Sequence, residues 1–249
     1  MQLFLERAFM IKIKKSNELL WLMGILFVAI GVTLADKANL GVSMIAAPAF
    51  IISEALIRFS SFFSVGTSEY LLQGLLLIIL CFIIRRFNWK FLLAFAVAVI
   101  YGYTLNFFLW LARDIVIEAV WARWVTLIIG DVITAFGVAC YFKTYMPLQV
   151  YELFVAQSAE VFKVNIAKIK WIFDLSLLAI SIILALTLFG DVGSFDFSTL
   201  IYSSYHSIGL GTIVTTLINS PIINTMSKLI DKFIDPTPLF PKLKSRLSI

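Results

Sequence analysis

Residues 91–111 read FLLAFAVAVIYGYTLNFFLWL, a run without a single charged side chain. A helix needs roughly 17–25 residues to cross the hydrocarbon core of a bilayer, so this run has the length of one membrane span. A span in lipid must satisfy its own backbone hydrogen bonds, which favours a helix. The alternating polar and apolar segments of a membrane β-barrel are absent from the sequence. The run therefore predicts an α-helical membrane segment.

The composition of the whole chain points the same way. Its 249 residues are 61% hydrophobic and 14% charged, whereas soluble domains are about 45–50% apolar and about 25% charged. The net charge of +5 does not indicate a nucleic-acid partner, because the basic residues form short clusters between apolar runs. We therefore expect an all-α, polytopic membrane helix bundle, embedded as a single domain over residues 1–234.

Six runs are long enough to be transmembrane helices, whereas residues 40–57 are ambiguous because they contain Pro48 and Glu54. The six predicted spans cover residues 19–35, 68–85, 91–111, 124–142, 171–189 and 199–224. If residues 40–57 return to the outer face, 16 of the 20 lysine and arginine residues lie on the cytoplasmic side. If they cross, the best orientation places only 13 there. The positive-inside rule favours the first arrangement, with one re-entrant or half-helix segment and both termini cytoplasmic.

Two cytoplasmic segments follow from this map. Residues 147–163 carry a polar stripe that includes Gln149, Glu152 and Glu160, and they predict an amphipathic helix in the membrane interface. A regulatory docking helix is the alternative reading of this segment. Residues 235–249 contain three prolines and predict a flexible cytoplasmic tail. We find no convincing internal repeat, although Gly41–Pro48 and Gly209–Pro221 are loosely analogous glycine-to-proline stretches.

Polar residues inside the predicted spans suggest where a site lies. Asp131 is a carboxylate within span four. It indicates a proton or cation relay or a contact for a cationic group of a substrate, or else a protonated or helix-bonded carboxyl that serves packing. Asp174 lies near the start of span five, where it would favour the positive end of the helix dipole. In span six, small and polar side chains recur at four-residue steps, which suits helix packing or a wet cavity. These residues are Ser207, Gly211, Thr215 and Asn219.

The sequence offers little for catalysis. It has a single histidine, His206, which we read as an interfacial residue or a proton sensor, and it has no metal-ligand spacing. The stretch from Gly209 to Thr212 is not a phosphate-binding loop, because no strand precedes it and no Gly-Lys-Ser/Thr follows. We expect neither an enzyme nor a bound cofactor.

Several stretches, taken in order, resemble the YczE/YyaS/YitT group of bacterial integral membrane proteins. They are Leu40–Pro48 (LGVSMIAAP), Gly66–Tyr70 (GTSEY), Arg85–Phe87, Tyr101–Gly102, Val150–Phe154 (VYELF), Gly209–Thr212 (GLGT) and Asn219–Pro221. The resemblance implies a multi-pass protein of the bacterial cytoplasmic membrane, in a family whose molecular activity is largely unassigned. It also points to the segment 41–48, to Glu69 and to the stretch 209–219.

The leading hypothesis is a small-molecule transporter or permease with a site near the midplane. The site would lie between the segment from Gly41 to Pro48, Asp131, and the polar face of span six formed by Thr215 and Asn219. Its partners would be the lipid bilayer and an unidentified small molecule, with a homo-oligomer or a membrane partner as further options. The alternative is a non-transporting scaffold or regulatory subunit that acts through residues 147–163.

Overall fold

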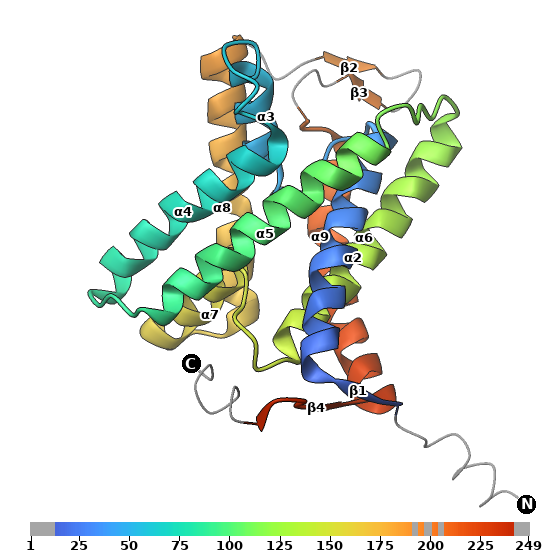
Figure 1. The fold of residues 1–249 in the computed structure, drawn as a ribbon. Helices are drawn as coiled ribbons and strands as arrows, with labels where there is room; N and C mark the ends of the chain where they lie inside the picture. The colour runs from blue at the N-terminus through green and yellow to red at the C-terminus, as the bar shows by residue number, and fades with distance from the viewer. Residues whose placement is uncertain (1–12, 191–193, 197–200, 204–206, 242–249) are drawn as a thin grey trace, which may run out of the picture.

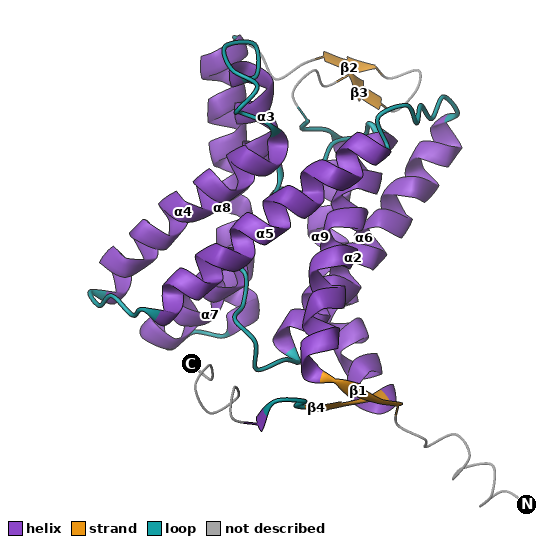
Figure 2. Cartoon of the chain, in the orientation of Figure 1, coloured by secondary structure: helices purple, strands orange, loops and turns teal. Residues whose placement is uncertain are grey.

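The computed structural model describes residues 13–190, 194–196, 201–203 and 207–241. Helices dominate this part of the chain, as Figure 2 shows. The eight helices within these ranges are α2 (Asn17–Ala38), α3 (Ala47–Leu56), α4 (Val65–Ile84), α5 (Lys90–Leu111), α6 (Val120–Phe142), α7 (Val150–Phe162), α8 (Ile166–Phe189) and α9 (Leu210–Phe233).

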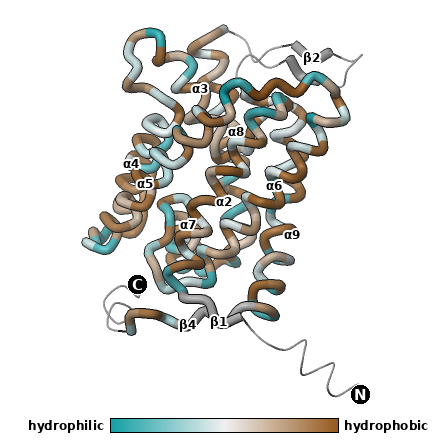
Figure 3. Tube along the Cα trace, turned by 45° about the vertical axis from the view of Figure 1, so that its right-hand side comes forward, coloured by the Kyte–Doolittle hydropathy of each residue, from teal (hydrophilic) through white to brown (hydrophobic). Residues whose placement is uncertain are grey.

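Five of the described helices are long and apolar enough to cross a membrane: α2, α4, α5, α6 and α8. Their outer faces carry large apolar side chains, such as Phe82, which is 78% exposed. Much of the hydrophilic sequence lies in the connections at the two ends of the helices (Figure 3). A soluble protein does not expose apolar surface on this scale, whereas lipid covers it readily. The prediction of a helical, multi-pass membrane architecture is confirmed in this form.

The last long helix does not begin where the apolar pattern predicts. We expected a span over residues 199–224, but residues 201–203 form strand β3, paired antiparallel with β2 (Ser194–Asp196), and α9 starts at Leu210. The chain turns just before α9, where Ser207 has a φ of 61° and the Gly209 N–H donates to Thr212 Oγ1. This local hydrogen bond caps the helix, so the apolar residues before it are not part of α9.

Both ends of the described chain lie at the same end of the bundle. Strand β1 (Ile13–Ser16) pairs in parallel with β4 (Ile234–Thr237), close to the ends of α2 and α9 (Figure 1). The backbone N–H groups of Leu239 and Phe240 donate to the Glu18 carboxylate at 3.0 and 3.2 Å. The expected flexible tail over residues 235–249 is therefore wrong for residues 235–237, because these residues find backbone partners in β1.

The ambiguous segment 40–57 contains one short helix, α3. Its ten residues would span about 15 Å, half of the hydrocarbon core. Pro48 occupies the first helical turn, where a missing N–H costs nothing. Helix α3 lies at the opposite end of the bundle from α7, the other short helix (Figure 1).

The order of helix lengths occurs twice along the chain. Long, short, long and long helices succeed one another from α2 to α5 and again from α6 to α9. A shift of 106 residues, the separation of Gly24 from Gly130, aligns residues 24–56 with residues 130–162 without a gap. The identical pairs in this alignment are Gly24 and Gly130, Ala29 and Ala135, Gly31 and Gly137, Val32 and Val138, Lys37 and Lys143, and Glu54 and Glu160. A shift of 101 residues then aligns the start of α4, Val65, with that of α8, Ile166.

Helix contacts follow the same equivalence. Helix α3 packs on α8 and its equivalent α7 packs on α4, while α2 packs on α5 and α6 packs on α9. Because α3 and α7 lie at opposite ends of the bundle, the second unit is inverted relative to the first (Figure 1). The symmetry is incomplete at one pair of helices. Helices α4 and α5 pack closely, whereas their equivalents α8 and α9 make few contacts.

The crossing of α2 and α6 marks the axis of this inverted repeat. A Cβ added at Gly24 would meet the Gly137 carbonyl oxygen at 3.1 Å, and one at Gly130 would meet the Gly31 oxygen at 2.8 Å. Each contact becomes the other when the two units are exchanged. Our expectation that no convincing repeat exists was therefore wrong, and the repeat relates residues 24–56 to 130–162 and not the two glycine-to-proline stretches.

Candidate functional site

A cavity of about 60 Å³ lies among the helices where the two repeat units meet. Twelve of its eighteen lining residues form six pairs that are equivalent under the repeat. The pairs are Val28 and Thr134, Val32 and Val138, Ser43 and Gln149, Ile45 and Tyr151, Ala46 and Glu152, and Glu69 and Lys170. The cavity therefore lies on the pseudo-two-fold axis. It has room for a few water molecules or a small ligand group.

Glu69 is the most deeply buried carboxylate on the cavity wall. It has no exposed surface, and its Oε2 accepts a hydrogen bond from the Tyr151 hydroxyl at 2.7 Å and a longer one from Gln73 Nε2 at 3.5 Å. Its Oε1 has no partner among the described residues. Ser64 caps the start of α4, and the Gly66 N–H donates to Asn106 Oδ1 at 2.8 Å, which fixes this end of α4 against α5. Glu69 is thus held rigidly with one oxygen unpaired.

Glu152 reaches the same cavity from the first turn of α7. It is 9% exposed, and its Oε2 also lacks a partner within the described part of the chain. Loss of hydration on burial raises the pKa of Glu152 to about 7. We predicted a surface helix here, but Gln149, Glu152 and Ser158 are buried against the bundle. The polar stripe of α7 faces the protein interior in its first half, and only its last turn, from Glu160 to Phe162, is exposed.

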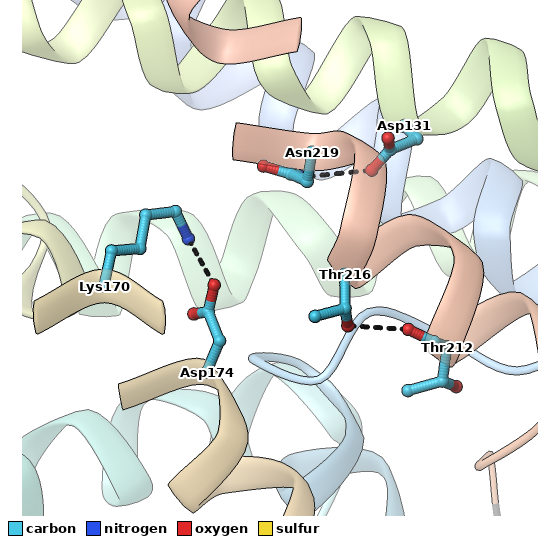
Figure 4. Close-up of polar contacts among 6 residues, drawn as sticks. All are labelled: Asp131, Lys170, Asp174, Thr212, Thr216 and Asn219. Carbon is cyan, nitrogen blue, oxygen red and sulfur yellow. Dashed lines mark hydrogen bonds and ion pairs between the residues drawn. The ribbon is translucent and has the colours of Figure 1, made fainter. Parts of the chain in front are cut away.

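Lys170 supplies the positive charge of the site. Its Nζ lies 2.9 Å from Asp174 Oδ2, one turn further along α8, and the two side chains are 15% and 9% exposed (Figure 4). We predicted that Asp174 lies near the start of its helix. It lies further along, because α8 begins earlier, at Ile166. Its partner is therefore a lysine and not the helix dipole.

Asp131 and Asn219, both predicted site residues, are brought together. Asn219 Nδ2 donates to Asp131 Oδ1 at 2.8 Å, joining α6 to α9 (Figure 4). Asn219 lines the cavity, whereas Asp131 lies behind it, 4% exposed and with Oδ2 unpartnered among the described residues. Asp131 therefore fixes the orientation of the Asn219 amide beside the cavity.

The predicted glycines meet each other at a separate junction outside the cavity. Gly41 has a φ of 98°, and a Cβ added at Gly209 would meet the Leu40 carbonyl oxygen at 2.2 Å, so both positions require glycine. The Gly211 N–H donates to the Leu40 carbonyl at 2.8 Å, and Thr212 Oγ1 donates to the Val42 carbonyl at 2.7 Å. This junction fixes the start of α9 against the chain that leads into α3.

Two other predicted residues, Thr215 and Pro48, do not line the cavity. Thr215 is buried and donates to the Thr212 carbonyl of its own helix at 3.2 Å. Thr216 makes a similar bond to the same carbonyl (Figure 4). Pro48 is buried in the first turn of α3. His206 lies outside the described residues.

The sequence model of one protein family, described as a family of unknown function (DUF6198), matches residues 15–228. The chain belongs to the DUF6198 family. The match includes every residue that lines the cavity, and it names DUF6198 and not the YczE/YyaS/YitT group that the motifs resemble. No curated protein and no solved structure matches the chain significantly.

Sequence reasoning missed several charged or polar residues of this DUF6198 site, among them Tyr151, Glu152 and Lys170. Tyr151 and Glu152 were assigned to a surface helix, and Lys170 was counted among the cytoplasmic basic residues. The internal alignment carries the signal that would have found them, since it makes Lys170 the equivalent of Glu69, a residue already singled out.

Proposed function

We propose that this protein is a small-molecule transporter of the bacterial cytoplasmic membrane. One observation carries the proposal: a cavity lined by buried charged residues lies on the axis of an inverted repeat. Charged groups inside a membrane protein are costly, and they commonly mark a substrate or ion pathway. Inverted repeats around a central site are characteristic of secondary transporters.

The membrane topology in this proposal has six crossings, with α3 as a half-helix on the outer side and both termini in the cytoplasm. Helix α9 is the sixth crossing, since its 24 residues would extend about 36 Å. It is more polar than the other five helices because it lies against α6 and contributes Asn219 to the cavity. The basic residues support this orientation, and so does the pairing of β1 with β4 at one end.

The repeat also suggests how the cavity would open to each side in turn. Ser43, Ile45 and Ala46 bound it on the side of α3, and their equivalents Gln149, Tyr151 and Glu152 bound it on the side of α7. Because the two sets occupy equivalent positions, each repeat unit could adopt the conformation that the other has in this structure. Such an exchange closes the cavity on one side and opens it on the other.

The packing of α7 does not favour the alternative of a scaffold or regulatory subunit. A docking helix needs an accessible face, but α7 packs on both α4 and α8 and buries much of its polar stripe. We therefore retain transport as the single proposed function, without a catalytic step or a cofactor.

The proposal predicts that cavity residues can be reached from both faces of the membrane. Val32→Cys and Val138→Cys, placed in a background in which Cys81 and Cys140 are alanine, test it in proteoliposomes of known orientation. We expect a membrane-impermeant thiol reagent to modify each cysteine from either side, because the cavity opens alternately. The measurement is the fraction of labelled protein with time.

Ile183→Cys provides the matched control. Ile183 lies on the outer surface of α8 with 59% of its area exposed, where lipid would shield it. It should stay unlabelled from both sides. Labelling of Val32→Cys and Val138→Cys from one face only, or from neither, would contradict a transport pathway through this cavity.

A further inference from the structure

The charges around the cavity do not balance. Glu69, Glu152 and Lys170 line it, and Lys170 is already paired with Asp174 at 2.9 Å. Neither Glu69 nor Glu152 therefore forms an ion pair with a lysine or arginine among the described residues. Glu69 and Glu152 also repel each other when both are charged. A cation bound here would pair with these carboxyl groups and stabilise their charged form.

The hydrogen bonds show the same excess of acceptors. Glu69 Oε1, Gln73 Oε1 and Glu152 Oε2 are buried and have no donor within the described part of the chain. An unpaired buried acceptor costs about 1–3 kcal/mol, so several of them near one cavity call for a ligand that brings donors. The Tyr151 hydroxyl donates to Glu69 Oε2, and Glu152 is the next residue of α7.

The remaining walls suit an organic group and not a hydrated metal ion. Val28, Val138, Val155 and Ile223 are apolar, and the aromatic residues Tyr101 and Phe173 also line the cavity. Aromatic faces attract organic ammonium groups, and aliphatic side chains cover an alkyl chain. Calcium and magnesium ions instead require about six oxygen ligands. No group of three or more His, Cys, Asp or Glu side chains among the described residues could hold a metal.

We infer that the cavity binds a small primary amine in its ammonium form, with its N–H groups donating to Glu69 and Glu152 and its alkyl part between the apolar walls. This inference rests on the proposed function, because it names the class of molecule that the transporter would carry. The ammonium group supplies both the positive charge and the donors that the wall lacks. An anionic ligand would meet two carboxyl groups and one lysine that is already paired with Asp174.

Thermal unfolding of the purified, detergent-solubilised protein tests the inference with propylammonium chloride as the probe. We expect saturable stabilisation by propylammonium. We expect none from sodium chloride at equal ionic strength, from butyrate or from 1-butanol, and weaker stabilisation from tetramethylammonium, which has no N–H donor. Glu152→Gln should weaken the apparent affinity by about tenfold or more, since a charge-assisted hydrogen bond is lost.

Glu160→Gln is the matched control, because Glu160 lies on the same helix but is exposed. It should bind propylammonium like the unmodified protein. Glu69→Gln provides a second variant if Glu152→Gln fails to fold, and the ligand series on the unmodified protein needs neither variant.

Several results would overturn the inference. They are stabilisation by butyrate or sodium in place of propylammonium, equal stabilisation by tetramethylammonium, and unchanged affinity in both glutamine variants. Binding in detergent does not depend on the cavity opening to both faces. A failure here together with two-sided labelling of Val32→Cys would therefore refute the substrate class and leave the transport proposal standing.

Discussion

Replacing Gly31 with valine is expected to destabilise the protein strongly, with a large fall in its apparent unfolding temperature or loss of folded protein. A Cβ at Gly31 would lie 2.1 Å from Thr134 Oγ1, 2.5 Å from the Gly130 carbonyl oxygen and 2.7 Å from the Thr134 nitrogen. The threonine side chain can rotate, but the backbone atoms cannot move unless α2 and α6 separate. Overpacking of this kind costs about 1–3 kcal/mol and more where backbones collide. Thermal unfolding in detergent measures the effect.

Three further variants make this test specific. Gly31→Ala combined with Thr134→Ala should recover part of the loss, because the closest contact is removed while the Gly130 contact remains. Gly137→Val should also destabilise, since it occupies the equivalent position and a Cβ there would lie 2.9 Å from the Gly24 oxygen. Leu26→Val, on the outer face of α2, should have little effect. An unfolding temperature of Gly31→Val close to that of the parent would contradict the close crossing of α2 and α6.

Replacing Lys170 with methionine is the second change with a large expected effect. It leaves Asp174 buried, 9% exposed and without its partner at 2.9 Å, close to Glu152. Removing one member of a buried ion pair commonly costs 3–5 kcal/mol, because the remaining charge is uncompensated. We therefore expect a fall in the free energy of unfolding of about that size, measured by chemical denaturation in detergent.

The double variant separates the charge effect from a loss of packing. Lys170→Met with Asp174→Leu removes both charges, and its stability should return close to that of the parent. Lys168→Met, an exposed position on the same helix, should change the stability little. If Lys170→Met were as stable as Lys168→Met, the ion pair would not be a buried element of the site.

The helices could be predicted well because a membrane imposes length and apolar character on each span. The expected span over residues 91–111 and helix α5, Lys90–Leu111, differ by a single residue at the start. The same criterion failed at α9, because hydropathy does not register the turn at Ser207 and the helix cap at Thr212. It also could not show that residues 234–237 pair with β1, because that pairing depends on the backbone of a distant segment.

The candidate site was predicted less completely than the helices. Asp131 and Asn219 were singled out because a polar residue within an apolar run is conspicuous, and the structure joins them by a hydrogen bond. Glu152 and Lys170 were not singled out, because they lie outside the predicted spans. Glu152 belonged to the predicted interfacial helix, and Lys170 was counted among the cytoplasmic basic residues. A polar stripe on a helix indicates that one face is polar, but it does not tell whether water or a protein cavity lies against it.

The internal repeat was missed because the two glycine-to-proline stretches were compared and the stretches from Gly24 and Gly130 were not. The two glycine-to-proline stretches do meet in space, since Thr212 Oγ1 donates to the Val42 carbonyl at 2.7 Å. They are neighbours, however, and not equivalents. The true equivalence became visible once the lengths and contacts of the helices were known.

Labelling of the loops that follow the two short helices tests most directly whether the repeat units are inverted across the membrane. Ser60→Cys follows α3 and Lys163→Cys follows α7, and both positions are exposed. In intact cells, with Cys81 and Cys140 replaced by alanine, an impermeant maleimide should label Ser60→Cys at once and Lys163→Cys only after the cells are opened. Labelling of both positions from the same face would contradict the inverted repeat and the cavity placed on its axis.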